Sequence, residues 1–122
     1  MTTFNTSCAD ISDLNGSCEL NSSNQITSYT SNNTQLGTTT DITNLSDPQP
    51  HAKVTFTNSV TSKKVKYKVR GTLSGSGSSI TISGSAEEDD EAKKDKPGIG
   101  DYDDVWTATA VTVQPAAAAK GN

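Results

Sequence analysis

The fold is decided by residues 63–70, KKVKYKVR, in which apolar and cationic side chains alternate. In a β-strand, alternation with a period of two places Val65, Tyr67 and Val69 on one face and the cations on the other. On a helix the same residues would spread around the circumference and leave no apolar stripe. The segment therefore predicts a half-buried strand.

More strands are predicted on both sides of this segment. The patterns indicate strands at residues 52–58, 63–73, 79–83 and 104–114, and the first three form an antiparallel meander. In the last strand the apolar parity changes near Ala110, which predicts a bulge or a strand buried on both faces. The inward positions predict one shared core. It consists of Val54, Phe56, Val65, Tyr67, Val69, Ile80, Ile82 and Trp106.

The chain before the prolines at 48 and 50 has a different composition, dominated by Ser, Thr and Asn. Residues 25–31 and 35–44 are plausible strands with a weakly defined register. Their scarce inward candidates are Ile26, Leu36, Ile42 and Leu45. We expect residues 1–24 to be a polar, loop-rich segment and residues 115–122 to be a flexible tail.

Length and composition predict a single all-β domain over residues 1–122. The chain has 122 residues, which fits one core, since domains typically hold about 100 to 150 residues. With only 30% hydrophobic residues and no amphipathic helix pattern, we expect a small antiparallel β-sandwich of about six or seven strands. The net charge of −4 does not favour nucleic acid as a partner. No apolar run is long enough to predict membrane insertion, and no signal-peptide core follows Met1.

Cys8 and Cys18 lie in a polar segment that has little else to hold it together. A disulfide between them would restrict the unfolded chain by roughly 2.5 to 3 kcal/mol, and we expect it to form. The alternative is two free thiols in a reducing compartment. Two cysteines and one histidine are too few for a closed zinc site.

Asn-x-Ser/Thr triplets favour a secreted, extracellular protein. They begin at Asn5, Asn15, Asn21, Asn32 and Asn44. A segment this rich in Asn, Ser and Thr also produces such triplets by chance, which leaves a cytoplasmic location as the alternative.

Two charged features are candidate sites. Lys64, Lys66, Lys68 and Arg70 form a ladder of cations on one strand face, and with Tyr102 they are the predicted ligand-binding residues. The ladder would suit sulfates or phosphates, or it could serve solubility and protect a sheet edge. Asp101, Asp103 and Asp104 could supply oxygen ligands to calcium, the one cofactor considered. The alternative for them, and for the acidic run at 87–91, is a solvated loop.

No catalytic set is recognisable in the sequence. His51 is the only histidine, and its place after Pro50 indicates the surface start of a strand. No Gly-x-Ser-x-Gly turn and no phosphate-binding glycine loop are present. The sequence therefore predicts that the protein is not an enzyme.

The opening residues 4–11, FNTSCADI, resemble the first strand of the cyanovirin-N-like lectins, which are small β proteins that bind mannose-rich glycans. That family closes its first disulfide over a longer interval than Cys8 to Cys18. It also repeats a segment of which residues 40–44, TDITN, carry only a trace.

These features predict a non-enzymatic, lectin-like binding module that recognises a glycan or another extracellular surface ligand. Abundant hydroxyl and amide groups could bind sugars, and Tyr102 and Trp106 could stack on sugar faces. One alternative is a structural or assembly protein that meets a host or partner protein surface. The others are a calcium-dependent adhesion module and a small hydrolase that uses acidic residues.

Overall fold

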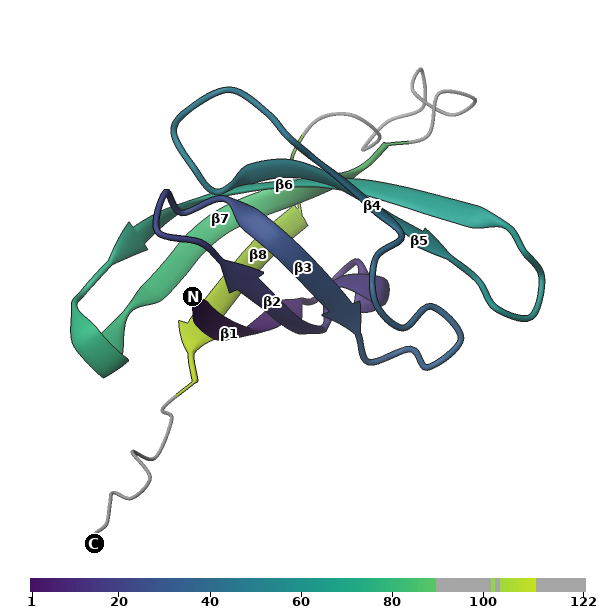
Figure 1. Cartoon of the computed structure of the whole chain (residues 1–122), viewed down its shortest axis with the longest axis horizontal. Coiled ribbons are helices and arrows are strands. Elements are labelled where there is room, and N and C mark those ends of the chain that lie inside the picture. The colour runs from purple at the N-terminus through teal and green to yellow at the C-terminus, as the bar shows by residue number, and fades with distance from the viewer. Residues whose placement is uncertain (90–101, 103, 112–122) are drawn as a thin grey trace, which may run out of the picture.

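The protein has an all-β fold in a computed structural model that describes residues 1–89, 102 and 104–111 (Figure 1). Two short 3-10 turns, η1 (Ser12–Leu14) and η2 (Gly77–Ser79), accompany the strands. Within the described part of the chain, no helix has the length and apolarity needed to cross a membrane. The strands are β1 (Thr2–Cys8), β2 (Gly16–Leu20), β3 (Ile26–Ser31), β4 (Asp41–Asn44), β5 (His51–Thr57), β6 (Lys64–Ser74), β7 (Thr81–Glu88) and β8 (Asp104–Ala110).

All eight strands belong to one antiparallel sheet with the order β3-β2-β1-β8-β7-β6-β5-β4. Neighbours in the sheet are neighbours in the chain, except that β1 pairs with β8, where Phe4 lies opposite Ala110. The sheet is therefore a meander whose first and last strands are joined, and its strands curve around a common interior (Figure 1). The expected sandwich of six or seven strands is not found, because this single sheet curls instead of dividing into two layers.

Residues 38–40, at the end of the connection between the two edge strands β3 and β4, form hydrogen bonds that link the two edges of the sheet. Thr38 forms an isolated bridge with Thr30 of β3, and the Thr39 N–H donates to the Tyr29 carbonyl at 2.8 Å. The next N–H, of Thr40, donates to Thr55 of β5 at 2.8 Å. Asn44 of β4 also donates its side-chain amide to the Ile26 carbonyl at 3.3 Å. These bonds make the sheet a nearly closed barrel.

The N-terminal segment contains two strands, so the expectation that residues 1–24 are loop-rich is wrong. In β1 the inward positions are Phe4, Thr6 and Cys8, and in β2 they include Cys18 and Leu20. The parity is that of a half-buried strand, but small and polar residues hold part of the inward set. Thr6 is tolerated inside because its hydroxyl donates to the Leu14 carbonyl at 2.8 Å.

The predicted core is confirmed. Of its members, Val65 and Ile80 are partly buried against the others, which are fully enclosed. The enclosed ones are Val54, Phe56, Tyr67, Val69, Ile82 and Trp106. In β8, Trp106, Ala108 and Ala110 share the inner face as expected, whereas the predicted strand end at 112–114 lies outside the described residues.

Two facing glycines make room for the indole ring of Trp106. Gly71 of β6 pairs with Gly84 of β7, and Gly84 also pairs with Trp106 of β8. A Cβ added at Gly71 would lie 3.2 Å from the Trp106 ring and 2.4 Å from Ile82. The absence of side chains at this pair therefore allows a large aromatic group to fill the interior.

A short chain of hydrogen bonds crosses the core. The Trp106 indole N–H donates to the Tyr29 hydroxyl at 2.8 Å, and this hydroxyl donates to the Leu14 carbonyl at 2.6 Å. On the same turn, Asp13 accepts from the Tyr67 hydroxyl at 2.7 Å. The polar atoms of three buried aromatic residues are thus paired, and η1 is tied to the interior.

The predicted disulfide is wrong, since Cys8 and Cys18 are both buried and free. Cys18 lies opposite Phe4, and Cys8 lies four positions farther along β1. At about 3.3 Å per strand residue, this register separates the two cysteines by roughly 13 Å. A disulfide needs Cα atoms within about 7 Å, so the barrel holds the thiols too far apart.

The burial of two cysteine thiols and two tyrosine hydroxyls predicts that the fold loses stability at alkaline pH. Burial raises the pKa of the Cys18 thiol from 9.0 to about 12, and it also raises the pKa values of Cys8, Tyr29 and Tyr67. An unfolded chain would release the thiol protons near pH 9, whereas the folded chain retains them. The contribution of these groups to stability should therefore be constant below about pH 9 and fall between about pH 9 and pH 12.

Urea unfolding in the presence of a reductant, measured at intervals from pH 7 to pH 11, would test this expectation. Cys18→Ala should make the decline above pH 9 shallower, whatever its effect at neutral pH. A free energy of unfolding that stays level up to pH 11 would contradict the prediction.

Candidate functional site

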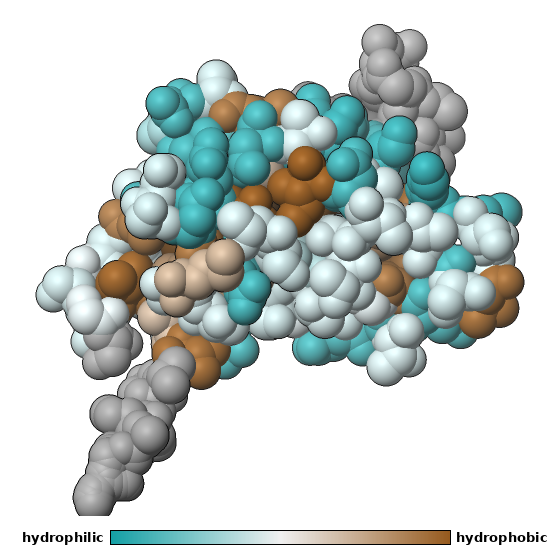
Figure 2. Space-filling view, viewed as in Figure 1, coloured by the Kyte–Doolittle hydropathy of each residue, from teal (hydrophilic) through white to brown (hydrophobic). Residues whose placement is uncertain are grey.

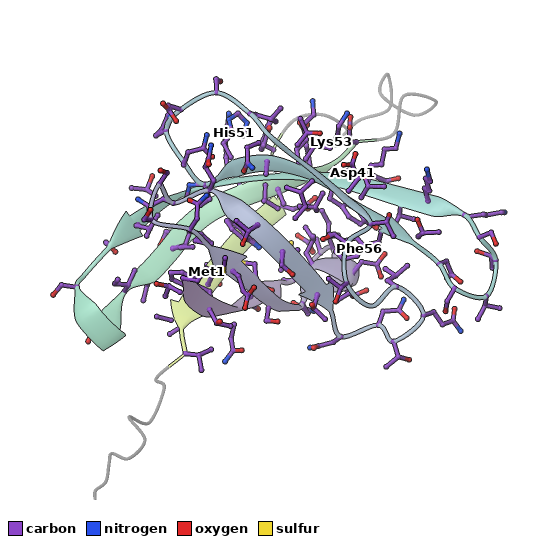
Figure 3. The ribbon with its side chains drawn as sticks, in the orientation of Figure 1. Met1, Asp41, His51, Lys53 and Phe56 are labelled. Atoms are coloured by element: carbon purple, nitrogen blue, oxygen red, sulfur yellow. The ribbon has the colours of Figure 1, made fainter. Side chains whose placement is uncertain are left out.

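The outer faces of β4 to β7 carry polar and charged side chains in a regular arrangement. One cross-strand row contains His51, Arg70 and Ser85, and the next contains Lys53, Lys68 and Glu87. Figure 3 shows His51 and Lys53 on the outer side of the sheet, with Phe56 toward the interior. Figure 2 shows hydrophilic residues gathered over the same strands. The period-two alternation that builds the core on one face therefore also builds a charged surface on the other.

Tyr102 lies against this surface and holds Arg70 and His51. The Arg70 guanidinium carbon is 3.9 Å from the centre of the Tyr102 ring, which is a cation–π contact. The Tyr102 hydroxyl is 2.9 Å from His51 Nε2, and His51 Nδ1 is 2.9 Å from the Ser46 carbonyl. Because a carbonyl only accepts, Nδ1 carries a proton and donates it to Ser46, and Nε2 is the ring atom that faces the Tyr102 hydroxyl. Burial and then the charge of Glu87 raise the pKa of the Tyr102 hydroxyl, against the opposing effect of Arg70.

Ion pairs occupy the middle of the charged face. Lys68 lies 4.0 Å from Glu87 and 3.9 Å from Asp89, and Lys53 lies 3.7 Å from Asp89. Glu87 is only 3% exposed although it occupies an outward position. Lys68 is therefore partly neutralised where it stands.

The members of the predicted cation ladder differ in their contacts with neighbouring side chains. All four members point outward as expected, because their strand parity is that of the solvent face. Arg70 contacts the ring of Tyr102, and Lys68 is paired with acidic side chains. Lys64, Lys66 and Arg70 are exposed, whereas Lys68 is half-buried.

A first depression, which we name the serine pocket, lies where the loop after β4 meets β6 and β7. It has a volume of about 400 Å³. Its charged groups are Asp47 and Arg70, and four of the other eight lining residues carry a hydroxyl group. The residues that line it are Ser46, Asp47, Pro48, His51, Arg70, Gly71, Thr72, Ser83, Gly84 and Ser85.

A second depression, which we name the threonine groove, lies over β4, β5 and β6 and has a volume of about 370 Å³. Thr55 is only 6% exposed, so it lies at the floor, and the hydroxyls of Thr40 and Thr57 are 2.9 Å apart. Figure 3 shows Asp41 and Lys53 on this side of the sheet. The lining residues are Thr40, Asp41, Thr43, Lys53, Thr55, Thr57, Lys64 and Lys66.

The other predicted site residues are not assembled into a site by the described structure. Asp101 and Asp103 lie outside the described residues, and Asp104 begins β8. The part of the chain that the structure describes contains no group of three or more His, Cys, Asp or Glu arranged to hold a metal ion. The acidic run was expected to be a loop, but Glu87 and Glu88 belong to β7. Trp106 is fully buried, so the expectation that it stacks on a sugar is wrong.

The sequence interpretation missed the contributions of β4, β5 and the Ser46–Pro48 loop. Lys53 and Thr55 occupy the positions between inward Ala52, Val54 and Phe56, so their outward direction could have been read from the same alternation. The approach of Tyr102 to His51 could not be read in this way, because the two residues are distant in sequence.

Fold and site together define a small antiparallel, barrel-like β protein with two polar depressions on one outer face. A comparison with known protein families, with curated proteins and with solved structures found no match.

Proposed function

We propose that this protein is a non-enzymatic binding module that recognises a glycan through the outer face of β4 to β7. The observation that carries the proposal is the serine pocket, whose volume of about 400 Å³ falls within the usual range of small-molecule sites. A secreted, extracellular location belongs to the same proposal. It is supported by the exposure of Asn5 and Asn32, which begin two of the Asn-x-Ser/Thr triplets.

The chemistry of the serine pocket suits a sugar. Ser83, Ser85 and Thr72 offer hydroxyl donors and acceptors, and Asp47 and Arg70 offer a planar acceptor and a planar donor. A saccharide presents hydroxyls that donate and accept, so it can satisfy such a mixed set. Tyr102 holds the Arg70 side chain in place before a ligand arrives, which lowers the entropy cost of binding.

The arrangement around His51 supports binding without catalysis. Both ring nitrogens are engaged, one by the Ser46 carbonyl and the other by the Tyr102 hydroxyl. A histidine that activates a serine needs one free nitrogen directed at the serine oxygen. In this arrangement the ring instead fixes Tyr102 beside the pocket.

Ser83→Leu should abolish most glycan binding, because Ser83 is exposed and lines the serine pocket, so the larger apolar leucine side chain would fill that pocket. A glycan array followed by calorimetry with the best-bound saccharide would measure the effect. We expect a loss of affinity of roughly tenfold or more, as for the removal of one or two good hydrogen bonds.

Thr109→Leu is the matched control, because Thr109 is exposed on the outer face of β8 and does not line the pocket. It should bind as the unchanged protein does. An array without any bound saccharide, or an equal loss in both variants, would refute the proposal.

A further inference from the structure

We infer that the threonine groove is a subsite for a sulfate group, so that the ligand of this protein is a sulfated glycan. The inference rests on the proposed function and names its ligand class. Lys64 and Lys66 are exposed on one wall of the groove, and Lys53 of β5, which is paired with Asp89 at 3.7 Å, also lines it. The opposite wall carries a single acidic group, Asp41.

The strand register sets the spacing of these cations. Lys64 and Lys66 are two residues apart on one face of β6, which is about 7 Å. Lys53 is the diagonal neighbour of Lys66 across the β5–β6 pair, at about 7 to 8 Å. Lys53, Lys64 and Lys66 therefore lie on three sides of Thr55, and Asp41 of β4 lies on the fourth. An anion at the groove floor could meet the two exposed lysines and a hydroxyl.

The two depressions lie side by side on the same face. His51 of the serine pocket and Lys53 of the threonine groove are two residues apart on β5. Arg70 and Lys66 are four residues apart on β6, with Lys68 between them. Because Lys68 is already paired with Glu87 and Asp89, it separates the two depressions without competing strongly for an anion. An oligosaccharide could therefore place a neutral residue in one depression and a charged substituent in the other.

The shape and lining of the groove favour a glycan over other polyanions. No aromatic side chain lines it, whereas platforms for single-stranded nucleic acid stack bases on aromatic rings. The lining also holds no Leu, Ile, Phe or Trp that could enter a lipid surface, and its floor is recessed. Asp41 would repel a uniform polyanion but can accept a hydrogen bond from a sugar hydroxyl.

The test compares a heparin-derived hexasaccharide with its fully desulfated counterpart, using calorimetry at two salt concentrations. The sulfated probe should bind more tightly, and salt should weaken it more. Lys64→Gln/Lys66→Gln should weaken the sulfated probe by roughly five- to twentyfold and leave the desulfated probe unchanged, because exposed charge contacts are individually small. Lys63→Gln is the matched control, since Lys63 is an exposed neighbour that does not line the groove, and it should change affinity by less than about twofold.

Equal binding of the two probes would overturn the inference of a sulfate subsite and leave the proposed function standing. If neither probe bound while the array showed neutral saccharides bound, the sulfate subsite would again be overturned and the proposed function would stand. Tighter lysine-dependent binding to phosphatidylserine vesicles or to oligothymidylate would overturn the inference in favour of another polyanion. An equal loss in Lys63→Gln would show that net charge, and not the groove, governs affinity.

Discussion

Gly84→Ala should lower the free energy of unfolding by about 3 kcal/mol or more, because the new methyl group would have no space. A Cβ at this position would lie 1.9 Å from the Arg70 carbonyl oxygen and 2.6 Å from the Gly71 Cα. Both neighbours are backbone atoms of the adjacent strand, so relief requires the strands to separate. Chemical unfolding followed by the fluorescence of the single tryptophan would measure the change.

Two further variants control for this result. Ser85→Ala, at the next position and outward, should change stability by less than about 0.5 kcal/mol. Gly71→Ala should cost less than Gly84→Ala, because its nearest contact, at 2.4 Å, is a side-chain methyl of Ile82 and not a backbone atom. If Gly84→Ala were as stable as the unchanged protein, the close pairing of β6 and β7 would be wrong.

Trp106→Ala should cost about 3 to 5 kcal/mol, the usual range for the loss of a buried large aromatic side chain. Trp106 is completely buried and packs against Tyr29, with ring centres 6.4 Å apart. Its removal would leave a cavity and take away the N–H group that donates to the Tyr29 hydroxyl. Circular dichroism would follow the unfolding of this variant, which has no tryptophan.

Val105→Ala gives the matched control for Trp106→Ala. Val105 is the preceding residue of β8, points outward and is 64% exposed, so its truncation should be nearly neutral. Trp106→Phe should fall between the two, since it keeps a ring in the core but lacks the indole N–H. Similar stabilities for Trp106→Ala and Val105→Ala would show that the two faces of β8 are assigned the wrong way round.

The second half of the fold was predictable because its sequence alternates strongly. In β5 and β6 the inward residues are Val54, Phe56, Tyr67 and Val69, and Thr or Lys stands between them, so parity alone assigns the faces. β1 and β2 were not predicted, because Thr6, Cys8 and Gly16 weaken the same alternation. The closure of the sheet was not predicted either, because the pairing of β1 with β8 depends on contacts that no local pattern contains.

The sequence could predict which side chains of the candidate site point outward, but it could not predict which of them form ion pairs. Strand parity was enough to place Lys66 and Lys68 on one face. It could not show that Lys68 meets Glu87 while Lys66 remains exposed, since this depends on which strand lies alongside β6. The prediction of a disulfide was wrong for the same reason, because closeness in sequence does not give the register of β1 and β2.

The joining of β1 to β8 has a consequence for how the chain folds. β1 leaves the ribosome before the other seven described strands, yet one of its two neighbours in the sheet is β8, with Cys8 opposite Trp106. Pairing between such remote segments must first overcome a large loop-closure entropy, which makes folding slow. Until β8 emerges, the nascent chain carries an open strand edge along β1 and an interior that lacks its largest side chain. This is the stage of biosynthesis at which the chain is most exposed to aggregation and to capture by chaperones.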